Sequence, residues 1–232
     1  MNKTRQSDII SAQLLNMTSV TMIGTGGIGA ATSLALAKLG IPRMTLYDDD
    51  TIEDINIPTQ LLKISDIGKS KALSVAQTLS EYSDEVHGNV RLCRVEENTA
   101  LPHSTIMISS VDSINARKAI WEAVVSNQGR WYLDARMGAE VFQLYTVDTA
   151  DPGWYIDHLS TLNEDEVPDA PCTAKATIYT AFIAAGHIAH QVKRIVMSQT
   201  LPRVLVHDIE AMALVLPGGH HYDSGHTMDQ SW

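Results

Sequence analysis

Short apolar runs alternate with helical segments along the first two thirds of the chain. The runs are rich in β-branched residues and predict strands at residues 19–23, 43–47, 89–95, 105–109, 131–134 and 141–147. Helical periodicity predicts a short helix at residues 7–16 and longer helices at 30–39, 69–80 and 116–125. This alternation predicts an α/β, Rossmann-like fold whose mostly parallel sheet is covered by helices on both faces.

Residues 151–171 follow the pattern of neither element. Prolines at 152, 168 and 171 and an acidic run at 163–166 predict a long crossover loop. An alanine-rich helix of about 25 residues is expected from Thr173, apolar on nearly all sides and therefore buried. One or two late strands at 203–215 and a loose tail from Pro217 complete a single expected domain over residues 1–232.

Charge and composition disfavour several classes of protein. The chain has 17 Lys and Arg residues against 27 Asp and Glu, and its net charge of −10 argues against binding nucleic acid or an anionic membrane. We find no membrane span and no apolar segment of a secretory signal, so we expect a cytoplasmic protein. Two cysteines support neither a disulfide framework nor a Cys₄ zinc site.

A glycine-rich loop lies between the first predicted strand and its helix. Its glycines are Gly24, Gly26, Gly27 and Gly29, and they let backbone N–H groups and a helix N-terminus approach a phosphate. Asp48 ends the second strand, where a carboxylate holds ribose hydroxyls in dinucleotide-binding folds. Taken alone, the loop and this aspartate indicate a nicotinamide cofactor.

The residues beyond Asp48 change that interpretation. They run Asp48-Asp-Asp50, then Asn56 to Gln60, then Gly68-Lys-Ser-Lys71-Ala, and later Asp112 to Arg117 and Leu133-Asp134-Ala. In order and spacing, over about residues 5–200, this pattern resembles the ThiF/MoeB group of the ubiquitin-activating-enzyme superfamily. The motifs of that group are D-x-D, N-x-x-R-Q, G-x-x-K-A and D-N-x-x-x-R.

The resemblance implies an adenylyltransferase that uses ATP and Mg²⁺ to activate the C-terminal carboxylate of a small ubiquitin-like or sulfur-carrier protein as an acyl adenylate. Residues 1–150 would then be the nucleotide-binding half, 151–216 the crossover loop, long helix and late strands, and 217–232 the tail. By matched position, Asp112 would hold Mg²⁺ and Lys71 would neutralise developing charge. The nucleotide would lie against the four glycines and contact Asp48, Asp50, Asn56 and Gln60.

One position departs from the family pattern. Thr59 replaces the arginine of N-x-x-R-Q, so a cation expected near the phosphates is absent from its usual place. Arg136 is a candidate to compensate, because it follows a predicted strand whose carboxyl end would face the ligand crevice. Arg5 resembles the N-terminal arginine with which family members reach the active site of the other subunit, and it predicts a homodimer.

The two cysteines carry different expectations. Cys172 directly precedes the predicted long helix, whose positive end would favour a thiolate. It resembles in part the transfer cysteine of activating enzymes, which would accept the acyl group as a thioester. The alternative is a small buried residue that tightens the start of the helix. Cys93 lies within a predicted strand and is expected in the core.

Other functions stay open on sequence alone. An NAD- or FAD-dependent oxidoreductase would explain the glycine loop and Asp48, but would leave Lys71 and Asp112 without roles. A non-catalytic, nucleotide-binding partner of the same fold would explain Thr59. A relative that modifies tRNA is disfavoured by the net charge of −10.

Overall fold

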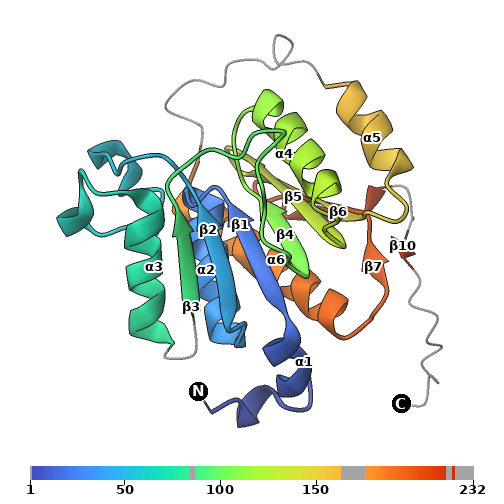
Figure 1. The fold of residues 1–232 in the computed structure, drawn as a ribbon, viewed down its shortest axis with the longest axis horizontal. Helices are drawn as coiled ribbons and strands as arrows, with labels where there is room; N and C mark the ends of the chain where they lie inside the picture. The colour runs from blue at the N-terminus through green and yellow to red at the C-terminus, as the bar shows by residue number, and fades with distance from the viewer. Residues whose placement is uncertain (1, 84–86, 163–175, 218–220, 223–232) are drawn as a thin grey trace.

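The computed structural model describes residues 2–83, 87–162, 176–217 and 221–222. Its large sheet has the strand order β3-β2-β1-β4-β5-β6-β8-β9 (Figure 1). The bounds of these strands are β1 (Ser19–Ile23), β2 (Arg43–Tyr47), β3 (His87–Arg91), β4 (Ile106–Ser109), β5 (Trp131–Gly138), β6 (Val141–Asp148), β8 (Val204–Asp208) and β9 (Ala213–Val215). Strands β7 (Leu201–Pro202) and β10 (His221–Tyr222) form a separate pair.

The sheet has a parallel part and an antiparallel part. Strands β3, β2, β1, β4 and β5 run parallel to one another, as the sequence predicts. Strands β6, β8 and β9 extend the sheet with antiparallel pairing. Strand β5 pairs with β4 from Trp131 to Asp134 and continues to Gly138 beside β6, because a tight hairpin joins β5 to β6. The end of β5 therefore projects beyond the parallel part.

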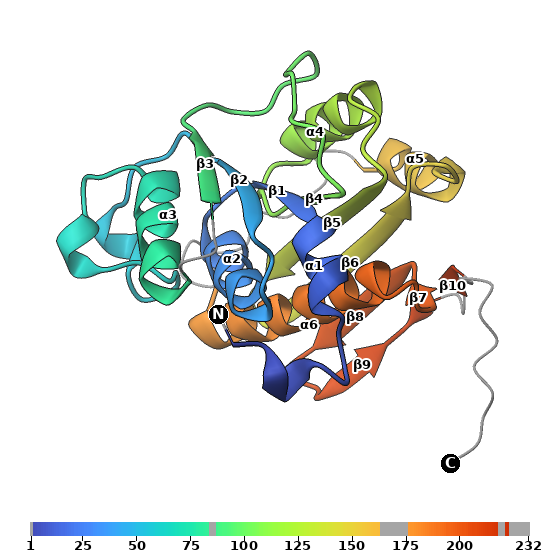
Figure 2. The same cartoon turned by 60° about the horizontal axis from the view of Figure 1, so that its bottom comes forward.

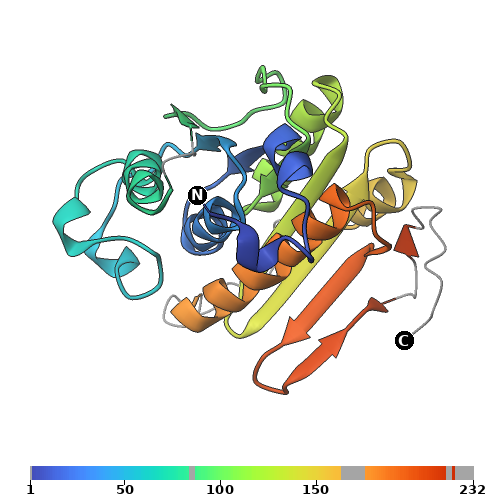
Figure 3. The same cartoon turned by 90° about the horizontal axis from the view of Figure 1, so that it is seen from below.

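Helices cover both faces of the sheet, which confirms the predicted layers. Their bounds are α1 (Ala12–Met17), α2 (Gly27–Leu39), α3 (Lys71–Tyr82), α4 (Ile114–Ser126), α5 (Gly153–Ser160) and α6 (Ile178–Val196), with short 3₁₀ turns η1 (Thr4–Gln6), η2 (Asp54–Asn56) and η3 (Ile64–Asp66). Figure 2 shows α4 and α5 on one side of the sheet and α2 and α6 on the other. From below, α6 runs beside the antiparallel strands (Figure 3).

Each face of the sheet has its own hydrophobic core, because successive side chains of a strand point to opposite faces. In β1, Met22 belongs to the core under α2 and α6, and Ile23 belongs to the core under α4 and α5. Ala31 of α2 meets Ala181 and Ala185 of α6 in a third, smaller cluster. These short side chains let the two helices pack closely, so α6 lies beside the helix that carries the glycine loop.

The predicted loop after residue 150 contains a helix that the sequence analysis missed. Helix α5 spans Gly153–Ser160, and Pro152 and Gly153 begin it instead of preventing it. Its residues Tyr155 and Leu159 are one helical turn apart, and both are buried in the core shared with α4. Tertiary packing of one apolar face stabilises this short helix. The neighbouring prolines and glycines led the sequence analysis to predict a loop instead.

The long helix α6 begins later than predicted. Thr177 is its N-cap, and the Thr177 hydroxyl accepts a hydrogen bond from the Thr180 amide at 3.3 Å. The side chains of Tyr179 and Phe182 are about half exposed, so the expectation of burial on nearly all sides is wrong. The predicted helix at residues 7–16 is also shorter, because Ser11 caps α1 at Ala12. Within the part of the chain that the structure describes, no helix is long and apolar enough to cross a bilayer.

Candidate functional site

The glycine loop joins β1 to α2 in a tight turn. Gly24 has φ of +88°, in the left-handed region that favours glycine. A Cβ on Gly29 would overlap the carbonyl oxygen of Gly24 and lie 2.8 Å from Ser110 Oγ. The Ser110 hydroxyl donates to that same carbonyl at 2.9 Å. The N-cap of α2 is Gly26, whose lack of a side chain leaves the first N–H groups of the helix free to meet an anion.

Asp48 holds the loop from the end of β2. Its Oδ2 accepts hydrogen bonds from the Thr25 amide at 2.6 Å and from the Thr25 hydroxyl at 3.0 Å. Its Oδ1 accepts from the Asp50 amide at 2.9 Å. The predicted ribose-binding carboxylate therefore lies beside the glycine loop, and it also orders that loop.

Lys71 reaches the same edge of the sheet from the first turn of α3. Its Nζ lies 2.8 Å from Asp50 Oδ2, and its backbone amide donates to the Asp50 carbonyl at 3.0 Å. The Lys71 side chain is 11% exposed, whereas that of Asp50 is 54% exposed. The structure thus brings together two predicted site residues, with a largely buried cation next to an exposed carboxylate.

The segment between Asn56 and Gln60 borders the glycine loop. The carbonyl oxygen of Thr59 lies 3.4 Å from the position of a Cβ on Gly27. The Gln60 amide nitrogen lies 3.8 Å from the corresponding position on Gly26, and among the described residues Gln60 Oε1 is a buried atom without a hydrogen-bond partner. Asn56 Oδ1 accepts from the Glu53 amide at 2.9 Å and so caps η2. An unpaired polar atom beside an open helix N-terminus suits a polar ligand.

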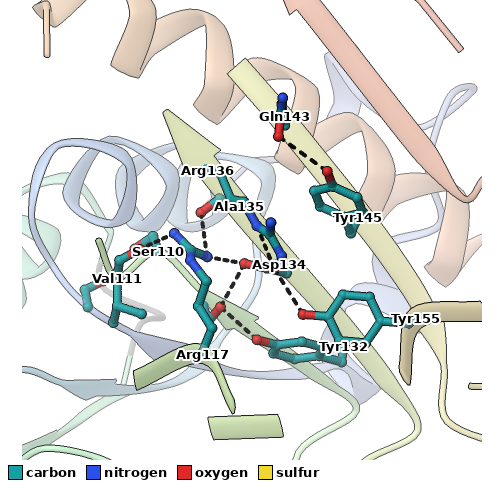
Figure 4. Close-up of polar contacts among 12 residues, drawn as sticks. Ser110, Val111, Arg117, Tyr132, Asp134, Ala135, Arg136, Gln143, Tyr145 and Tyr155 are labelled. Atoms are coloured by element: carbon teal, nitrogen blue, oxygen red, sulfur yellow. Dashed lines mark hydrogen bonds and ion pairs between the residues drawn. The ribbon is translucent and has the colours of Figure 1, made fainter. Parts of the chain in front are cut away.

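Asp112 lies exposed in the loop after β4, and a buried network holds that loop. Arg117 of α4 donates to the carbonyl of Val111 and to the carboxylate of Asp134 on β5 (Figure 4). Its guanidinium also donates to the Ala135 carbonyl at 3.2 Å. Arg117 therefore ties the residue before Asp112 to the neighbouring strand.

Asp134 is fully buried at the centre of this network. Its Oδ2 accepts from Arg136 Nε at 2.8 Å and from the Tyr155 hydroxyl at 2.9 Å, and its Oδ1 accepts from Ser109 at 3.3 Å (Figure 4). Burial acts to raise the pKa of Asp134, but the positive charges of Arg117 and Arg136 outweigh it and hold the pKa below its ordinary value. The carboxylate is charged and joins α4, α5 and β5.

Arg136, the predicted compensating cation, is a member of this network. Both its Nε and its Nη2 donate to Asp134, and its guanidinium lies 4.4 Å from the centre of the Tyr145 ring. The side chain is 16% exposed. The ion pair with Asp134 and the contact with the Tyr145 ring hold the Arg136 guanidinium against the sheet. A contact between Arg136 and phosphate stays a prediction.

Arg5 is exposed in η1, at the opposite end of α2 from the glycine loop. The neighbouring Gln6 donates from Nε2 to the carbonyl of Leu39 at 2.7 Å, which fixes η1 against the C-terminal end of that helix. Helix α2 has 13 residues, which corresponds to a length of about 20 Å. Arg5 is therefore remote from the glycine loop of its own chain.

The structure contradicts the prediction for Cys93 and does not describe Cys172. Cys93 is exposed, because β3 ends at Arg91 and the chain then leaves the sheet edge, so the expected core position is wrong. Cys172 lies outside the described residues. The helix expected directly after it begins instead at Ile178.

Two features of the site were not found from the sequence. Arg94 donates from Nε to Asp49 Oδ2 at 2.9 Å, at the rim of the acidic cluster, where the carboxylates of Asp48, Asp49 and Asp50 lie within 4.8 Å of one another. Tyr155 contacts Asp134 from a helix that was predicted as loop. The acidic triplet was the available signal for a cationic partner, but nothing in the sequence pattern identified which cation.

The sheet order explains why these residues share one site. Asp48 to Asp50 follow β2, the glycine loop follows β1 and Asp112 follows β4, and these three strands are parallel neighbours. Their carboxyl ends form the crevice in which such folds bind ligands. Helix N–H groups, a buried lysine and hard carboxylate oxygens suit a phosphorylated ligand accompanied by a divalent cation.

Comparisons with known proteins identify the family of this chain. The ThiF family matches residues 7–215. The adenylyltransferase and sulfurtransferase MOCS3 of Dictyostelium discoideum is 31% identical over 121 residues, which are 50% of this chain and 28% of the relative. Ubiquitin-like modifier-activating enzyme 5 of Arabidopsis thaliana is 35% identical over 68 residues, 29% of this chain and 16% of the relative. The chain thus spans less than a third of each of these relatives.

Solved structures show the same fold. Escherichia coli MccB with ATP superimposes with a TM-score of 0.72 at 20% identity, covering 92% of this chain and 66% of MccB. PaaA superimposes with a TM-score of 0.66 at 18% identity, covering 92% of this chain and 75% of PaaA. With a family match over most of its length and a fold shared with these structures, the chain belongs to the ThiF family.

Proposed function

We propose that this protein is an ATP-dependent adenylyltransferase that activates the C-terminal carboxylate of a small ubiquitin-like or sulfur-carrier protein. The observation that carries the proposal is the convergence of the glycine loop, Asp48, the Lys71–Asp50 pair and Asp112 at one edge of the sheet. Membership of the ThiF family supports it, as do the names of the relatives.

The reaction makes a carboxylate reactive. One carboxylate oxygen attacks the α-phosphorus of ATP, the bond between that phosphorus and the bridging oxygen breaks, and pyrophosphate leaves. Because both reactants are anions, the site must hold them in line and neutralise the charge that develops on the phosphate oxygens. The open N-terminus of α2 and the ammonium group of Lys71 are suited to that task.

We assign the other residues by position. Asp48 binds the ribose and the four glycines line the nucleotide, with Asp50, Asn56 and Gln60 around it. Asp112 holds Mg²⁺, which neutralises and orients phosphate oxygens when bound. Arg117 keeps the Asp112 loop in place through Val111. Arg136 is assigned to the phosphate side, and acyl transfer to Cys172 stays a prediction.

Substitution of Lys71 tests this assignment. We expect Lys71→Ala to weaken binding of ATP–Mg²⁺ by about 10- to 100-fold, because a charge-assisted contact to phosphate is lost. The measurement is titration calorimetry with ATP–Mg²⁺ and, separately, with NAD. Lys69→Ala is the matched control, since Lys69 is 57% exposed and pairs with Asp66 outside the site.

The parent protein should bind ATP–Mg²⁺ more tightly than NAD, and the Lys69 control should match the parent. Equal or tighter binding of NAD would contradict the adenylyltransferase proposal and favour an oxidoreductase. ATP binding without pyrophosphate release, measured with a small acceptor protein that ends in Gly-Gly, would instead favour a non-catalytic partner, the alternative that Thr59 supports.

We also propose a homodimer in which Arg5 of one copy contacts the nucleotide of the other. Arg5 is remote from the glycine loop of its own chain, because η1 packs at the far end of α2, a helix about 20 Å long. Sedimentation velocity should therefore show a species of twice the 25.4 kDa chain mass. A 25.4 kDa species at every working concentration would contradict the dimer and the role of Arg5.

A further inference from the structure

Arg94 is an exposed cation anchored close to the glycine loop. It lies three residues beyond the end of β3, and the next residue, Val95, is buried in the same core as Ile23 of β1 and Tyr47 of β2. The Arg94 side chain is 75% exposed, and its Nε lies 2.9 Å from Asp49 Oδ2. The backbone at this point is therefore fixed by Val95, while the guanidinium remains in solvent.

Asp49 pairs with this guanidinium, and the charges of two further carboxylates act on it. The hydrogen bond to Asp49 raises the pKa of Arg94, and the negative charges of Asp49, Asp50 and Asp112 act in the same direction. Asp49 and Asp50 follow β2 and Asp112 follows β4, and the sheet order places β1 between those strands. Asp48, the neighbour of Asp49, contacts Thr25 of the glycine loop, so the Arg94–Asp49 pair lies at the same edge of the sheet as that loop.

The site needs a further cation. The polyphosphate of ATP would enter an edge that already carries Asp48, Asp49, Asp50 and Asp112. Lys71 is largely buried and already paired with Asp50, and Thr59 contributes no charge beside Gly27. Arg136, the cation assigned to the phosphate side, is already engaged by two hydrogen bonds to Asp134. Exposed ion pairs such as that of Arg94 with Asp49 contribute little stability, so Arg94 can leave Asp49 at small cost.

We propose that Arg94 exchanges Asp49 for the polyphosphate of bound ATP and, in addition to the role predicted for Arg136, compensates for the arginine missing at position 59. The inference rests on the proposed function and adds a binding residue to it. The guanidinium can donate to two phosphate oxygens at once, which a lysine cannot do with the same geometry. The contact involves the phosphates beyond the α-phosphate, so it distinguishes ATP from AMP.

Nucleotide affinities of four variants test this exchange. We would measure dissociation constants for ATP–Mg²⁺ and for AMP by calorimetry at one ionic strength, because screening changes such contacts. The variants are Arg94→Ala, Arg94→Lys, the double variant Arg94→Ala/Thr59→Arg, and Arg91→Ala. Arg91 is the matched control, since it is an exposed arginine at the end of β3 and its guanidinium donates to the Val90 carbonyl at 3.3 Å.

We expect Arg94→Ala to weaken ATP binding about tenfold or more and AMP binding less than about twofold. Arg94→Lys should recover part of the loss, and Arg91→Ala should match the parent. Thr59 borders Gly27, so the arginine in the double variant should reach the phosphates and restore most of the ATP affinity. Because Arg94 is exposed, its variants should unfold at the temperature of the parent.

Several results would overturn the inference. ATP affinity of Arg94→Ala within about twofold of the parent would show that the guanidinium does not contact the nucleotide. Equal losses for ATP and AMP would place the contact on the nucleoside instead. Failure of the double variant to recover would refute the link to position 59. If the parent itself binds no ATP, the proposed function fails as well, whereas normal parent binding with an unaffected Arg94→Ala overturns this inference alone.

Discussion

Asp134→Ala should destabilise the protein by about 3–5 kcal/mol, because it leaves two guanidiniums near one another without the carboxylate that pairs them. Asp134 is fully buried, and Arg117 is 5% and Arg136 16% exposed at their side chains. The Tyr155 hydroxyl also loses its acceptor, so α5 is loosened together with α4. Urea unfolding measures the change, and for a chain of this size we expect a fall in melting temperature of roughly 6–20 °C.

Matched variants separate the buried pair from ion pairs in general. Glu81→Ala removes the partner of Lys63 at the surface, where the two side chains are about half exposed, and should change stability far less than Asp134→Ala does. Asp134→Asn keeps the size of the side chain but removes its charge, so it should destabilise in the same direction as Asp134→Ala. A stability loss for Asp134→Ala no larger than that for Glu81→Ala would contradict the structural role of the network.

Protonation of Asp134 at low pH should also destabilise the protein. The pKa of Asp134 in the folded protein is below its ordinary value of 3.8, so its contribution to stability is complete above the unfolded pKa. The contribution is lost as the pH falls through the folded value, where the carboxylate is protonated in both states. Asp134→Asn should therefore lose less stability than the parent on acidification below about pH 4.

Gly29→Ala and Gly186→Ala should change stability in opposite directions, although both replace a glycine within a helix. A Cβ on Gly29 would overlap the Gly24 carbonyl oxygen, and that oxygen belongs to backbone that cannot move away cheaply. We expect a loss of about 1–3 kcal/mol or more, together with loss of nucleotide binding, because the β1–α2 turn must open.

Gly186 is the internal control for that substitution. No atom lies within 4 Å of the position of its Cβ, and the residue is exposed in the middle of α6. Alanine there reduces the conformational entropy lost on folding, so Gly186→Ala should stabilise the protein by about 0.5–1 kcal/mol. Unfolding free energies of the two variants decide the matter, and similar values would show that the glycine loop tolerates a side chain.

The sequence predicted the layers of this fold because each signal was local. The β-branched run of β1 and the alanine-rich pattern of α2 are sufficient to define a strand, a turn and a helix without knowledge of the rest of the chain. Helix α5 was missed because contacts with distant parts of the chain, and not its local sequence, stabilise it. In the sequence, Tyr155 is an aromatic residue among turn-forming residues. Only the fold brings it against Asp134 and the core under α4.

In the candidate site too, residues within motifs were predicted and contacts between distant residues were not. Motif spacing identified Asp48 and Lys71, and the structure places both at the glycine-loop edge. The pairing of Arg94 with Asp49 joins residues 45 positions apart and depends on how the chain leaves β3. No periodicity in the sequence encodes that path, so only the structure could show which cation faces the acidic cluster.

The packing of α2 against α6 has a consequence for biosynthesis. The alanine face of α2 is covered by Ala181 and Ala185, which are made long after the glycine loop itself. A nascent chain that has left the ribosome only as far as β6 holds all the strands of the parallel part, yet the face of α2 that packs on α6 is still uncovered. Because domains generally fold as units during synthesis, this half of the molecule must wait for the synthesis of α6 before its helices are fully packed.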